Sequence, residues 1–95
     1  MNVFWTATAE AHLNAIYAYI AQDSEVYVLS TVDKITRRPQ QIGDFPASGR
    51  KVPEYDIAQI REVLCGAYRI IYYIKPDQID VLAVLHASMN RLESE

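Results

Sequence analysis

Cysteine, glycine and long apolar runs are scarce in this 95-residue sequence, and each scarcity excludes a class of protein. The single cysteine, Cys65, offers no intramolecular disulfide and fits a reducing compartment, so we expect a cytoplasmic protein. The longest apolar runs, such as VLAVL at residues 81–85, fall far short of the roughly 20 residues that cross a bilayer. The opening MNVFWTATAE has neither a basic segment nor a continuous apolar core, so we expect no targeting segment and no membrane partner.

Metal- and cofactor-binding patterns are missing as well. The two histidines, His12 and His86, stand far apart in the chain, and no HExxH or CxxC spacing occurs. The three glycines are isolated, so there is no phosphate-binding loop, and no serine has a nucleophile-elbow context. We expect no metal and no cofactor. With 51% hydrophobic and 22% charged residues, the chain is predicted to form a single domain over residues 1–95.

The charge is unevenly distributed. Nine basic against twelve acidic residues give a net charge of −3. The segment from 34 to 51, however, holds five basic residues against one acidic residue, Asp44, which is locally +4: Lys34, Arg37, Arg38, Arg50 and Lys51. This segment is either a solvated helix end followed by a loop, or a surface that faces an anion or an acidic partner.

The first half of the chain is predicted to be a short strand followed by two helices. After a strand around residues 3–5, Thr6 can cap a helix whose apolar stripe includes Leu13, Ile16 and Ile20. Asp23 and Ser24 break this helix and can cap a second one, so that the two form an antiparallel hairpin. Pro39 is expected to perturb the end of the second helix, and a loop is expected from residue 43.

Three apolar strands are predicted in the second half, over residues 60–65, 68–74 and 79–86. The last two flank the sequence KPDQ, in which Pro76 and Asp77 are good turn formers, so they are expected to pair as an antiparallel hairpin. Both are expected to be central strands that the helices cover on one side. The order β, α, α, β, β, β predicts an α+β fold. In it a helical hairpin and an N-terminal strand pack on a three- to four-stranded antiparallel sheet.

Arg69 is a charged residue within the strand-like stretch GAYRIIYYI. If Ile74 pairs with Ile79, Arg69 lies opposite Val84 and on the same sheet face as His86, with these two side chains about 7–8 Å apart. Arg69 would then line an exposed groove on the open face of the sheet, away from the main core. The structural alternative is that Arg69 pairs with a carboxylate such as Glu62 or Asp80 and stiffens the sheet.

Several short motifs resemble the RelE/ParE superfamily of bacterial toxins, and the ParE branch more than the RelE branch. They are W-T-x-x-A before the first helix, GRKVPEY, IRE, G-x-YRI-x-Y, and a strand that closes on His86. The resemblance implies a β-α-α-β-β-β fold and a growth-inhibiting toxin of a type II toxin–antitoxin system, neutralised by an antitoxin from an adjacent gene. It further implies that the target is DNA gyrase, poisoned by binding, without sequence-specific DNA binding by this chain alone.

RelE-like members of the superfamily are instead ribosome-dependent mRNA endoribonucleases, and this alternative stays open. The positions that match their pattern are Glu54 as base, Arg69 as phosphate clamp and His86 as acid, with Arg50 and Lys51 on neighbouring phosphates. The acidic balance of the chain favours a gyrase-binding protein over this enzyme, since binding to phosphate-coated targets depends on Lys and Arg. The candidate target- or antitoxin-binding residues are Lys34, Arg37, Arg38, Arg50, Lys51, Arg69, His86 and Arg91.

Overall fold

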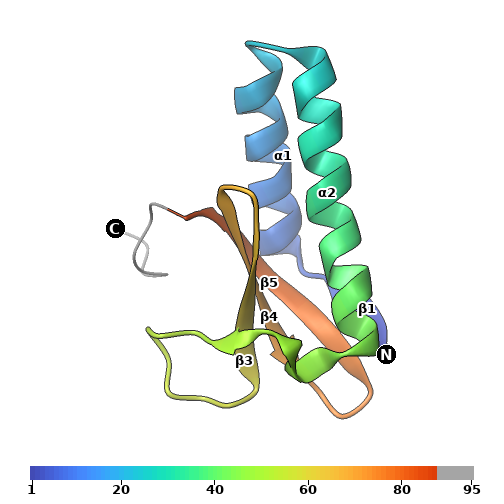
Figure 1. The fold of residues 1–95 in the computed structure, drawn as a ribbon, viewed down its shortest axis with the longest axis vertical. Coiled ribbons are helices and arrows are strands. Elements are labelled where there is room, and N and C mark those ends of the chain that lie inside the picture. The colour runs from blue at the N-terminus through green and yellow to red at the C-terminus, as the bar shows by residue number, and fades with distance from the viewer. Residues whose placement is uncertain (88–95) are drawn as a thin grey trace.

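A helical hairpin packed on one face of a five-stranded sheet makes up the computed structural model, which describes residues 1–87. Figure 1 shows the two helices side by side, with the turn between them lying beyond the sheet. The elements in chain order are β1 (Asn2–Trp5), α1 (Ala7–Ala21), α2 (Glu25–Asp44), a 3-10 turn (Pro46–Ser48), β2 (Arg50–Lys51), β3 (Ile60–Cys65), β4 (Tyr68–Ile74) and β5 (Gln78–His86). The predicted α+β class is confirmed.

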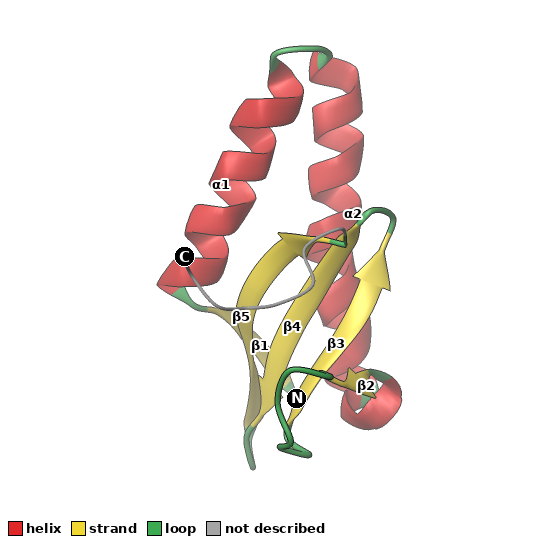
Figure 2. Cartoon of the chain, turned by 90° about the vertical axis from the view of Figure 1, so that its left-hand side faces the viewer, coloured by secondary structure: helices red, strands yellow, loops and turns green. Residues whose placement is uncertain are grey.

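The sheet has the strand order β1-β5-β4-β3-β2, so β4 and β5 are central strands as predicted. The sheet differs in two ways from the predicted sheet of three to four antiparallel strands. The pair Arg50–Lys51 adds a fifth, two-residue strand at one edge, and β1 at the other edge runs parallel to β5. Figure 2 shows the open face of this sheet, opposite the helices.

Both helices begin where the sequence predicts. The Thr6 hydroxyl accepts a hydrogen bond from the backbone N–H of Ala9, and the Ser24 hydroxyl accepts one from Tyr27. Each hydroxyl therefore satisfies one of the N–H groups that a helix leaves unpaired at its start. In the part of the chain that the structure describes, no helix has the length and hydropathy of a membrane span.

The perturbation predicted at Pro39 is wrong, because α2 continues through Pro39 to Asp44, two residues into the predicted loop. Pro39 has no N–H to donate to the turn before it, but its ring is buried. The last turns of α2 bury Ile42 completely, and the N-terminal ammonium of Met1 donates a hydrogen bond to the carbonyl of Gly43 at 3.0 Å. Packing and this added cation at the helix C-terminus outweigh the local preference of the proline.

Two apolar clusters lie on opposite faces of the sheet. The larger lies under the helices and includes Ala9, Ile35, Ile42, Val63, Ile70, Tyr72, Ile79, Val81 and Val84. The smaller lies on the other face and comprises Val52, Ile60, Ile71 and Ala83. Since Val52 follows β2 directly, the loop after β2 helps to cover the open face.

The predicted register of the β4–β5 hairpin holds only near its turn. Ile74 pairs with Ile79 as expected, but a bulge between Ile71 and Tyr72 shifts the remaining pairs by one residue. Arg69 consequently pairs with Leu85, and not with Val84. A one-residue shift exchanges the two faces of a strand, so the β5 side chains from Ala83 to His86 lie on the faces opposite to those predicted, whereas the β4 side chains keep their predicted faces.

Candidate functional site

Arg69 lies at the centre of a buried ion-pair network on the open face of the sheet. Its side chain is 6% exposed, and the Glu62 side chain beneath it is 0% exposed. The Arg69 Nε donates to Glu62 Oε1 at 2.7 Å. Glu62 on β3 and Arg69 on β4 are diagonal neighbours on one face, since Glu62 pairs with Ile71 and Arg69 with Leu64.

Glu54 completes the network from the loop after β2. Its two carboxylate oxygens accept hydrogen bonds from Nη1 and Nη2 of Arg69, each at 3.0 Å. This paired geometry is the strong form of an arginine–carboxylate contact. On the other side, Arg50 Nε donates to Glu62 Oε2 at 2.5 Å, so two arginines alternate with two glutamates and the formal charges cancel.

The pKa shifts follow from these contacts. Hydrogen bonds from Arg69 hold the pKa of Glu54 below its ordinary value, against the opposing effect of burial. The same bonds, with those of Glu62, raise the pKa of Arg69. Both residues are therefore charged at neutral pH, and three nitrogen atoms of the guanidinium already donate to carboxylates.

The prediction that Arg69 lines an exposed groove with His86 is wrong. His86 pairs with Tyr68, so its ring lies on the helix side of the sheet, where it meets the Tyr68 ring edge-on with centroids 5.6 Å apart. Arg69 is buried on the opposite face. Of the two carboxylates named as structural partners, Glu62 is confirmed, whereas Asp80 instead pairs with Lys75 at 2.7 Å. The structure thus brings Glu54 and Arg69 together and separates His86 from them.

The basic residues of the 34–51 segment divide into two groups. Lys34, Arg37 and Arg38 lie within α2, not at its end, and Arg50 and Lys51 form β2. Three of the five have a carboxylate partner: Arg37 with Asp33 at 3.0 Å, Arg50 with Glu62, and Lys51 with Asp56 at 3.1 Å. Arg38 donates to the side-chain oxygen of Gln41 at 3.2 Å. Arg91 lies outside the described residues.

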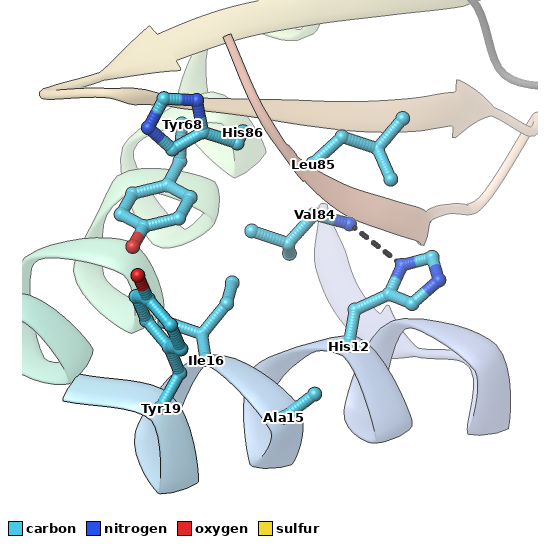
Figure 3. Close-up of a pocket in the computed structure, with 8 residues that line it drawn as sticks. All are labelled: His12, Ala15, Ile16, Tyr19, Tyr68, Val84, Leu85 and His86. Atoms are coloured by element: carbon cyan, nitrogen blue, oxygen red, sulfur yellow. Dashed lines mark hydrogen bonds between the residues drawn. The ribbon is translucent and has the colours of Figure 1, made fainter. Parts of the chain in front are cut away.

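A groove lies at the junction of α1 and β5, and no pattern in the sequence predicted it. It has a volume of about 560 Å³ and is lined by His12, Ala15, Ile16, Tyr19, Tyr68, Val84, Leu85 and His86 (Figure 3). A second hollow of about 320 Å³ shares Tyr19, Tyr68 and His86 with it and reaches Lys34. The sequence held one signal for it, because Tyr19 does not belong to the predicted apolar stripe of its helix. In the structure this tyrosine is 72% exposed.

Comparison with known proteins bears on the family and the fold of this chain. A family model described as the ParE toxin of the type II toxin–antitoxin system parDE matches residues 3–91. A solved structure titled "Chromosomal ParDE TA system from P. aeruginosa" is similar in fold, with a TM-score of 0.74 and 21% sequence identity. The similarity covers 90% of this chain and 95% of that one. A search of the curated proteins finds no match.

The fold defines a small α+β protein with a helical hairpin on one face of a five-stranded sheet, the architecture that the similar solved structure shares. Because the family model spans nearly the whole sequence, the chain belongs to the ParE toxin family of type II toxin–antitoxin systems. The predicted relationship to the ParE branch of the RelE/ParE superfamily is confirmed.

Proposed function

We propose that this chain inhibits bacterial growth from the cytoplasm by binding and poisoning DNA gyrase, and that a cognate antitoxin holds it inactive. The observation that carries the proposal is the match to the ParE toxin family over residues 3–91. Family membership alone leaves the target open, since one scaffold can host different sites. The geometry around Arg69 supports a binding protein over a nuclease.

An RNA-cleaving site needs a cation directed at the scissile phosphate, and a base and an acid on either side of it. Here Glu54 is held against Arg69 by two hydrogen bonds, and Arg69 is also bound to the fully buried Glu62. His86 extends from the other face of the sheet. A phosphate at Arg69 would have to displace Glu54, and no imidazole from β5 would reach its leaving oxygen.

The antitoxin is proposed to cover part of the basic surface on α2. Lys34 is exposed, and Arg38 donates a hydrogen bond to the neutral side-chain amide of Gln41, so both cations can gain from an acidic partner. Replacing both by Glu should weaken antitoxin binding at low salt and have less effect at high salt, because exposed charges are screened. Equal affinity at low salt would refute this part of the proposal.

The test of the target is pulse-labelling of DNA and protein synthesis within minutes of inducing the chain without its antitoxin. We expect DNA synthesis to fall first, and purified gyrase to lose supercoiling activity when the chain is added. If protein synthesis falls first and His86→Ala restores it, the chain is an mRNA endoribonuclease and the gyrase proposal is wrong. Arg69→Ala is a poor diagnostic, because it removes a partner of the buried Glu62 and so endangers the fold.

A further inference from the structure

The two edges of the sheet differ in how they are protected against pairing with another chain. The β2 edge is only two residues long, and both residues, Arg50 and Lys51, are basic. Short length and charge are devices by which proteins keep an edge strand from pairing. The β1 edge, Asn2–Trp5, is twice as long and has no charged residue, no proline and no bulge. The β1 edge is therefore the one that can accept a further strand.

The backbone groups of β1 alternate in direction. The N–H of Thr6 donates to the carbonyl of Val81 at 3.1 Å, and β1 runs parallel to β5 in unbroken register up to the pair Trp5–Val81. Because successive residues of a strand point their N–H and C=O groups to opposite sides, those of Phe4 also face β5, whereas those of Val3 and Trp5 point away from it. Within residues 1–87, no strand pairs with β1 on that side and no hydrogen bond reaches these groups. Figure 1 shows β1 beside the N-terminus at the right-hand margin of the molecule.

Phe4 is the large apolar residue that this edge leaves in solvent. It is 55% exposed, although it lies within a strand. Its neighbours Val3 and Trp5 pack against the apolar cluster under the helices, so Phe4 points to the open face of the sheet. A single exposed aromatic ring is common on protein surfaces. Here, however, the ring lies between the two residues whose backbone groups point outward.

We propose that β1 pairs antiparallel with β1 of a second copy of this chain, about a two-fold axis at Phe4, so that the two sheets become one. Val3 of each copy then lies opposite Trp5 of the other copy and exchanges both of its backbone hydrogen bonds with it. The two Phe4 rings meet across the axis on the open face. They form a non-hydrogen-bonded pair, the kind in which opposite side chains are closest. A two-fold pairing closes on itself and stops at the dimer.

Phe4 selects this register among the alternatives. Val3 opposite Val3, or Trp5 opposite Trp5, would also form a hydrogen-bonded pair. Each Phe4 would then lie opposite Asn2 or Thr6, and its ring would lose its aromatic partner. The interface is small, so we expect a dissociation constant between about 10 μM and about 1 mM. This inference goes beyond the proposed function and does not depend on the target of the toxin.

Phe4 and Leu64 provide a matched pair of variants for the test. Each is 55% exposed, and Leu64 pairs with Arg69 and so lies on the same open face, but in β3, which is separated from β1 by β4 and β5. The assay is sedimentation equilibrium of the purified full-length chain from about 10 μM to about 1 mM. Phe4→Lys places like charges opposite each other and should weaken dimerisation at least about tenfold, whereas Leu64→Lys should leave it within about twofold of the wild type.

The strand pairing is tested on the wild-type chain by amide hydrogen exchange followed by NMR, which needs no variant to fold. As the protein concentration rises through the dissociation constant, the Val3 and Trp5 amides should exchange more slowly, in proportion to the remaining fraction of monomer. The Phe4 amide faces β5 within one copy, so its exchange should change little. Dimerisation without this protection of Val3 and Trp5 would mean that another surface pairs, and the proposal would be wrong.

Other outcomes would also overturn the proposal. A chain that stays monomeric up to about 1 mM has no such pairing. Equal weakening by Phe4→Lys and Leu64→Lys would place the contact on the open face instead of the β1 edge. Association beyond the dimer would exclude the closed two-fold arrangement. If the Val3 and Trp5 amides become protected only when the purified product of the adjacent gene is added, that protein occupies the edge and a second copy does not. None of these outcomes depends on growth arrest, so the proposed function is tested separately.

Discussion

Replacing Arg69 by Met tests whether the buried network holds the open face of the sheet together. The change keeps the apolar stem of the side chain but leaves Glu62, whose side chain is 0% exposed, with Arg50 as its remaining basic partner. Removing one member of a buried ion pair costs about 3–5 kcal/mol when the other charge stays buried without compensation, and the remaining bond from Arg50 to Glu62 places this change near the lower end of that range. Against a typical total stability of about 5–15 kcal/mol, this is a large fraction.

The assay is urea unfolding followed by circular dichroism, with Arg37→Met as the control. The Arg37–Asp33 pair has a similar distance, 3.0 Å, but its side chains are 75% and 54% exposed. An exposed pair on a helix contributes only about 0.3–0.5 kcal/mol. Arg69→Met should therefore destabilise the chain several times more than Arg37→Met. Equal effects of the two variants would refute the argument that the Arg69 network supports the fold.

The same network predicts how stability depends on pH. The pKa of Glu54 is lower in the folded chain than its ordinary value of 4.5, chiefly because Arg69 donates hydrogen bonds to it. Glu54 thus contributes stability that is fully present above the unfolded pKa and is lost as the pH falls through the folded pKa. Glu54→Gln should flatten the acid-side loss measured by urea midpoints, and an unchanged profile would contradict this assignment.

Three smaller predictions concern the turn, the cap and an exposed pair. Gly49→Ala should lower stability by about 1–3 kcal/mol, measured by urea unfolding, because the added Cβ would collide with the Tyr72 hydroxyl. A cost near zero would show that the segment can shift. Thr6→Ala should cost about 1–2 kcal/mol, since the hydroxyl both caps α1 and bonds β5; no change in the unfolding midpoint would deny it that role. Lys75→Met should raise the pKa of Asp80, followed by NMR titration, because Lys75 is the main cause of its lowered pKa; an unmoved titration would contradict this pairing.

Prediction from the sequence succeeded where one local signal decided the outcome. The caps Thr6 and Ser24 lie where a hydroxyl precedes a helical stripe, and β3, β4 and β5 coincide with runs of β-branched and aromatic residues. It failed at Pro39, where the buried packing of the last turns of α2 overrides the local preference of a proline.

The site was predicted less well than the fold. The residue types, the side of the sheet on which Arg69 lies and its alternative partner Glu62 were predicted correctly, but the side on which His86 lies depended on one bulge. Nothing in the alternation of residues 79–86 announces a bulge, because the strand is apolar on both faces and tolerates either register. The groove was missed because its walls come from α1 and from both central strands, and no local pattern connects them.

The sequence by itself determined the elements of this protein, their order, its α+β class and its resemblance to the ParE toxins, because helix caps, periodicity and motifs are local properties. Only the tertiary structure decided that Arg69 is buried between two glutamates, that His86 lies across the sheet from it, and that a gap remains beside β5. These outcomes depend on the pairing of β3 with β4 and the loop after β2, on a one-residue shift between β4 and β5, and on where β1 ends relative to β5. Such relations exist only once distant segments pack together.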